Sequence, residues 1–120
     1  MVLTAIICMI AIAFALLACA YWRAPYFADL YSGHASTKYH PVMAGRYLSF
    51  AGFAAIAAIW GDARLTTAIF GLFALTALMD FLTYIRRDGH DGNAIAHFRA
   101  FIGSIAVAGW AYLSSGGVAP

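Results

Sequence analysis

Four apolar stretches, each about 19 to 22 residues long, dominate the sequence and are separated by one connection of moderate length and two short ones. About twenty apolar residues is the length that a helix needs to cross the hydrocarbon core of a bilayer. The stretches cover residues 2–22, 42–60, 64–85 and 94–113. The sequence therefore predicts an all-α integral membrane protein, in which an antiparallel four-helix bundle forms a single membrane domain over residues 1–120.

The composition argues against a water-soluble globular protein and against a nucleic-acid-binding protein. Hydrophobic residues make up 64% of the chain and charged residues 10%, whereas soluble domains have about 45–50% apolar and about 25% charged residues. The formal net charge is +2, and no cluster of basic residues exceeds the pair Arg86-Arg87. We therefore expect the lipid bilayer to be a partner of this chain, and we expect no nucleic-acid partner.

Basic residues are distributed unequally between the two sides of the predicted bundle. The connections after the first and third stretches lie on one side, and they hold four basic residues: Arg23, Lys38, Arg86 and Arg87. The opposite side holds Arg64. Because cytoplasmic loops are enriched in Lys and Arg, we expect a multi-pass protein of an inner or cell membrane with both termini non-cytoplasmic.

Three ionisable residues lie inside the apolar stretches, at similar depth. Arg46 is near the start of the second stretch, Asp80 near the end of the third and His97 near the start of the fourth. At 1.5 Å per residue, all three lie roughly 4–8 Å below the cytoplasmic boundary. An Arg or Asp at the centre of a membrane helix costs roughly 2.5–3.5 kcal/mol, so we expect Asp80 to contact Arg46 or His97 and not to face lipid.

A functional interpretation assigns a role to each of these three ionisable residues. Asp80 and His97 are the candidate catalytic residues, with Asp80 as the general acid or base and His97 as its proton partner. Neighbouring side chains on the same helices would bind and orient a substrate oxygen, and the candidate substrate-binding residues are Arg46, Tyr84, Ser49 and Phe101.

Helical spacing also predicts which residues face inward. Ser49, Phe53 and Ile56 lie at helical intervals from Arg46 and are expected to share its interior face. Phe73 is expected to form part of the lipid-facing surface.

Structural interpretations of the same residues stay open. Asp80 can form a salt bridge that only holds the bundle together. Arg46 and Arg99 are long enough to snorkel to lipid phosphates. His97 can make a hydrogen bond that serves helix packing alone.

The histidines do not form a recognisable metal-binding pattern. His34 and His40 are six residues apart, His90 lies in the third connection, and neither His-x-x-His nor Glu-x-x-His occurs. A zinc or di-iron site is therefore not expected. A haem held by His97 or His40 would lack a second ligand at matching depth, so the sequence predicts no metal and no cofactor.

The order of polar features resembles a known family. Gly45-Arg46 opens the second stretch, Asp80 is followed by a basic turn, and His97 comes early in the fourth stretch. This order resembles that of short four-helix members of the broad DoxX-like membrane protein superfamily, over residues 23–113. Where the family's pattern has Asp after the Arg, this chain has Tyr47. The resemblance implies an antiparallel four-helix bundle, linked in some members to quinone chemistry or to processing of lipophilic small molecules.

Two functions fit these features. The first is a membrane-embedded isomerase or cyclase, whose cytoplasm-side polar pocket binds a lipophilic small molecule and transforms it by isomerisation, epoxide opening or cyclisation. The second is a non-catalytic accessory subunit of a larger membrane complex, such as a quinone-linked one. Ala11, Ala15 and Ala18 form a stripe of small residues that would let a partner helix approach closely. A homo-oligomer is a further possible assembly.

The distribution of basic residues makes a prediction about topology. A reporter that is active only in the cytoplasm should be active when inserted at Gly89 and inactive when fused after Pro120. Activity after Pro120 together with inactivity at Gly89 would reverse the predicted orientation.

Overall fold

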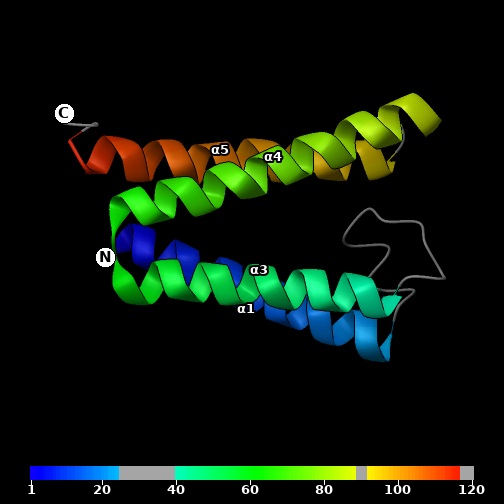
Figure 1. Ribbon diagram of the computed structural model, residues 1–120, viewed down its shortest axis with the longest axis horizontal. Helices are drawn as coiled ribbons and strands as arrows, with labels where there is room; N and C mark the ends of the chain where they lie inside the picture. The colour runs from blue at the N-terminus through cyan, green and yellow to red at the C-terminus, as the bar shows by residue number, and fades with distance from the viewer. Residues whose placement is uncertain (25–39, 89–91, 117–120) are drawn as a thin grey trace.

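Helices account for nearly all of the chain that the structure describes. The computed structural model describes residues 1–24, 40–88 and 92–116. This part of the chain folds into four helices (Figure 1): α1 (Val2–Arg23), α3 (His40–Trp60), α4 (Ala63–Asp88) and α5 (Gly92–Ser114). Each is long and apolar enough to cross a membrane. The predicted all-α, four-helix membrane fold is confirmed, and the chain is a multi-pass membrane protein.

The four helices pack as two pairs (Figure 1). Helix α1 lies along α3, and helix α4 lies along α5. The pairs come together at the short turn between α3 and α4 and diverge toward the opposite end of the bundle. Because each pair is held mainly by its own two helices, the space between the pairs depends on side chains that bridge them.

The turn between the pairs has clear sequence signals. Gly61 adopts φ +63°, which glycine tolerates at no steric cost. The side chain of Asp62 then caps α4, because its Oδ1 accepts a hydrogen bond of 2.7 Å from the backbone N–H of Leu65. This glycine and this cap end one helix and start the next within a few residues.

Small residues bring the helices of the first pair close together. Ala54 and Ala57 are 0% exposed and belong to a core cluster with Ile7, Phe70 and other apolar residues. Further along the same pair, Ala18 packs in a second cluster with Met43, Ala44, Tyr47 and Tyr21. Ala11 also packs against the first cluster, so at least two members of the alanine stripe on α1 make contacts within this chain.

Two expectations about helix faces are wrong. Phe53 and Ile56 are 51% and 36% exposed, whereas Phe73 is 6% exposed and lies in the core. Helix α3 presents its alanines to the interior because the short side chains allow close approach. Since residues facing the interior and residues facing lipid are both apolar, hydropathy alone does not reveal this rotation.

The close packing around Ala54 generates a stability prediction. Ala54→Leu should lower the thermal stability of the protein in detergent micelles, because overpacking a filled core costs about 1–3 kcal/mol. The matched control is Ala106→Leu on α5, where the residue is exposed, and the expected effect is within about 0.5 kcal/mol. Equal losses for both variants would contradict the proposed tight packing of α1 on α3.

Candidate functional site

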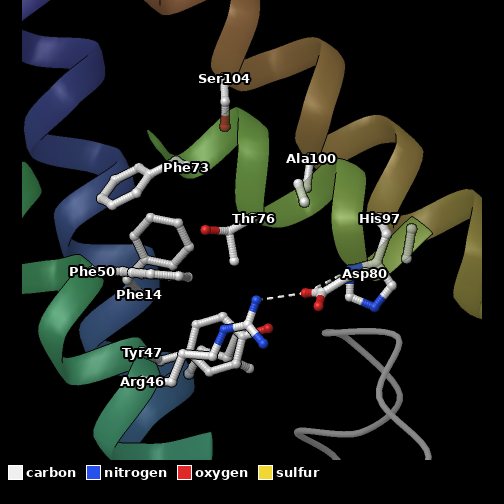
Figure 2. A pocket seen from close by; sticks show the side chains of 13 residues that line it. Phe14, Arg46, Tyr47, Phe50, Phe73, Thr76, Asp80, His97, Ala100 and Ser104 are labelled. Atoms are coloured by element: carbon white, nitrogen blue, oxygen red, sulfur yellow. Dashed lines mark hydrogen bonds and ion pairs between the residues drawn. The ribbon is translucent and has the colours of Figure 1, made fainter. Parts of the chain in front are cut away.

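An ion pair connects the two helix pairs. Arg46 on α3 places Nη2 2.5 Å from Oδ2 of Asp80 on α4 (Figure 2), and the two side chains are 27% and 22% exposed. Partial burial in the bundle strengthens such a contact relative to one in water. The prediction that Asp80 contacts Arg46 or His97 is confirmed.

His97 lies on the other side of the same carboxylate. Its Nδ1 is 3.6 Å from Oδ2 of Asp80, and the residue is 4% exposed. This separation is longer than a hydrogen bond, although catalytic contacts in ligand-free structures are often long and shorten when substrate binds. The ring of Tyr84 stacks on the imidazole, with the centroids 5.1 Å apart and the planes 15° from parallel. Tyr84 therefore helps to fix the plane of the imidazole beside Asp80.

These polar groups form one end of a cavity between the helix pairs. The cavity has a volume of about 180 Å³ and is lined by residues from all four helices. Away from the ion pair its walls are aromatic or small apart from one leucine, as Figure 2 shows in part, and they comprise Phe14, Leu17, Tyr47, Phe50, Phe73, Thr76, Ala77, Ala96, Ala100 and Ser104.

The aromatic walls of the cavity contact one another and the ion pair. The rings of Phe14 and Phe73 meet edge to face, with centroids 5.6 Å apart and an interplanar angle of 84°. The Arg46 guanidinium carbon lies 5.5 Å from the ring centroid of Phe50, a separation at which a cation is attracted to an aromatic face. Two contacts, one with Asp80 and one with Phe50, therefore hold the guanidinium.

The arrangement can position a polar group and exchange a proton with it. A carboxylate accepts hydrogen bonds or protons, and a guanidinium only donates hydrogen bonds. A ligand oxygen placed at this end of the cavity can receive a hydrogen bond from Arg46, and a ligand proton can pass to the Asp80 carboxylate, which can then return it to another atom of the ligand. The apolar walls would hold the remainder of the same molecule away from water.

Three of the six residues predicted for the site line the cavity. These are Arg46, Asp80 and His97. Tyr84 is not among the lining residues, but its ring stacks on that of His97.

Ser49 and Phe101 lie elsewhere. Ser49 is exposed, and its hydroxyl donates a 3.0 Å hydrogen bond to the carbonyl oxygen of Gly45 within α3. Phe101 is half-buried, with its ring centroid 6.4 Å from that of Phe98. Neither residue is among those that line the cavity, so the structure does not bring them to the ion pair.

The contribution of α1 to the site is absent from the sequence prediction. Phe14 and Leu17 line the cavity, but Arg23 at the end of α1 is the helix's only charged side chain, so no charge marks its inner face. A signal does exist. Ile7, Phe14 and Tyr21 are spaced seven residues apart, a spacing that places them on one helical face.

Within residues 1–24, 40–88 and 92–116, no three His, Cys, Asp or Glu side chains gather closely enough to hold a metal ion. His34, His90 and the side chain of His40 lie outside the described residues. The absence of a metal or haem therefore stays a prediction.

Comparisons with known proteins add no assignment. No protein-family model, curated protein or solved structure matches this chain. The resemblance to the DoxX-like superfamily stays a prediction that rests on Arg46, Asp80 and His97.

The geometry of the ion pair predicts energetic coupling between Arg46 and Asp80. In a double-mutant cycle with Arg46→Gln and Asp80→Asn, the coupling free energy of unfolding should be about 1.5–3 kcal/mol, the usual range for a hydrogen bond to a charged group. The control cycle pairs Asp80→Asn with Arg99→Gln, because Arg99 is exposed and is not among the cavity-lining residues. Additive effects in both cycles would contradict a stabilising ion pair.

Proposed function

We propose that this protein binds a small lipophilic molecule in the cavity between its helix pairs and transforms it by acid and base chemistry. The observation that carries the proposal is the position of the Arg46–Asp80 ion pair at one end of an aromatic cavity. An apolar pocket with a few convergent polar groups is the usual form of a small-molecule site. The ligand therefore combines an apolar body with one oxygen-containing polar group.

The size of the cavity limits the part of the ligand that it can enclose. An engineered cavity of about 150 Å³ holds one benzene molecule, and pockets for drug-sized ligands measure about 300–1,000 Å³. A volume of about 180 Å³ fits a group about the size of one ring with a single substituent. We infer that a group of this size is the reactive part of the ligand.

The polar end supplies the chemistry. Asp80 would take a proton from the ligand or give one to it, and His97 would return the proton to Asp80 or remove it, once their 3.6 Å separation shortens. Arg46 would orient the ligand oxygen, while Tyr84 keeps the imidazole plane in place. Isomerisation and cyclisation move a proton within one molecule, and epoxide opening adds one water.

The location of the cavity agrees with access from the cytoplasmic leaflet. Arg46 lies near the start of α3 and Asp80 near the end of α4, and these helix ends are at the end of the bundle where α1 ends and α5 begins (Figure 1). The distribution of basic residues assigns that end to the cytoplasmic side. We propose an inner or cell membrane location on the same basis, and the DoxX-like resemblance agrees with processing of a lipophilic molecule.

A function as an accessory subunit is the alternative, and the structure gives it less support. The sequence feature that suggests it is the alanine stripe on α1, yet Ala11 and Ala18 pack inside this chain. Under the accessory interpretation the Arg46–Asp80 pair only joins helices. Partner subunits should then accompany the purified protein, and no lipophilic molecule other than bulk lipid should do so.

The two functions can be separated by analysing what co-purifies. Wild-type protein and the Asp80→Asn variant should be transferred from their own cells' membranes into nanodiscs and extracted for mass spectrometry. We expect wild type to carry a lipophilic molecule enriched at least about tenfold over the surrounding membrane, a change of about 1.4 kcal/mol in binding free energy. The Asp80→Asn variant should carry a different molecule, the unreacted substrate, because the amide keeps its size but cannot cycle a proton.

The masses of the two molecules test the reaction class. They should have the same elemental composition for an isomerisation or cyclisation, or differ by one water for an epoxide opening. Arg99→Gln is the control and should behave as wild type. If no molecule is enriched in wild type, the binding function is wrong. If both proteins carry the same molecule, binding stands and catalysis by Asp80 is wrong.

A further inference from the structure

A second, smaller space adjoins the cavity on the side of α3 and α4. This groove has a volume of about 140 Å³ and is lined by Phe50, Phe53, Ile69, Leu72, Phe73 and Thr76. Phe50, Phe73 and Thr76 also line the central cavity. The two spaces are therefore separated only by side chains that they share.

The groove reaches the outer surface of the bundle. Phe53 and Leu72 at its rim are 51% and 63% exposed, whereas Ile69 and Phe73 at its floor are 8% and 6% exposed. None of the six described residues that line it is charged. In a membrane, a groove of this composition faces hydrocarbon and suits an alkyl or isoprenoid chain.

Two aromatic rings form the wall between the groove and the cavity. The ring centroids of Phe50 and Phe73 are 4.7 Å apart, with the planes inclined at 46°. Phe50 comes from α3 and Phe73 from α4, so the contact lies between the two helix pairs. A molecule that extends from the cavity into the groove must therefore pass between these two rings.

A larger groove lies on the outside of the first helix pair. It has a volume of about 690 Å³ and is lined by residues such as Ala15, Gly45 and Leu48. It shares no described lining residue with the central cavity. The groove between α3 and α4 does share such residues and therefore offers a molecule at the ion pair an apolar continuation.

We propose that the ligand is a single-tailed amphiphile whose ring-sized head occupies the cavity and whose hydrocarbon tail lies in the groove between α3 and α4. This inference rests on the proposed function and names the class of its substrate. The tail passes between Phe50 and Phe73 and emerges at Phe53 and Leu72. The ligand then reaches Asp80 sideways from the bilayer and keeps its tail in hydrocarbon throughout.

A pair of phenols tests the head and the tail separately. Para-methylphenol has the ring and the oxygen but no tail, and its binding to protein in nanodiscs can be measured by saturation-transfer NMR against empty nanodiscs. Para-octylphenol with a photoreactive diazirine at the tail end reports the position of the tail. After irradiation, we expect mass spectrometry to find adducts on Phe53, Ile69 or Leu72. An excess of unmodified para-octylphenol should reduce these adducts at least about tenfold.

A variant that fills the groove supplies the control. Leu72→Trp should reduce groove labelling about tenfold while binding of para-methylphenol stays unchanged. Ile102→Trp, at a residue 50% exposed on α5, should change neither. Binding of para-methylphenol with adducts spread over other lipid-facing residues, or equal labelling of both variants, would overturn the tail position alone. Absence of para-methylphenol binding would overturn the proposed function and the tail position together.

Discussion

The cost of placing a charge inside a bilayer explains the arrangement of this bundle. Arg46 and Asp80 lie on helices of different pairs, and each would be costly to expose to hydrocarbon. Their contact at 2.5 Å compensates both charges. At the opposite end of the bundle, the Gly61 turn joins the same two helices covalently. The pairs are thus connected at two ends, and the aromatic cavity lies between the ion pair and the core cluster near the turn.

A difference in side-chain size helps to explain why the space near the ion pair is not filled. The cavity lining combines large rings, including Phe14, Phe50 and Phe73, with small residues such as Ala77, Ala96 and Ala100. Rigid rings cannot spread to occupy the volume beside an alanine, and a flexible chain such as Met adapts more easily. The divergence of the pairs away from the turn (Figure 1) increases this space.

The sequence predicts the parts of the structure that depend on charge and length. Four spans follow from apolar length, and the contact of Asp80 follows from the cost of an unpaired carboxylate. The faces of the helices could not be predicted in the same way. Phe53 faces outward and Phe73 inward, yet both are apolar and both environments accept them. Ser49 shows the same difficulty, because its hydroxyl bonds to Gly45 of its own helix and needs no partner inside the bundle.

The position of the ion pair favours a role in binding over a role in stability alone. Bringing two charges into a low-dielectric bundle has a desolvation cost that offsets much of their attraction, and well-packed apolar side chains often stabilise a fold as well or better. Stability alone therefore gives little reason to place an ion pair at this position. Here both side chains keep about a quarter of their surface exposed and form part of a cavity wall, with His97 beside them. That exposure leaves the carboxylate accessible to a molecule in the cavity, as a group that binds or transfers a proton must be.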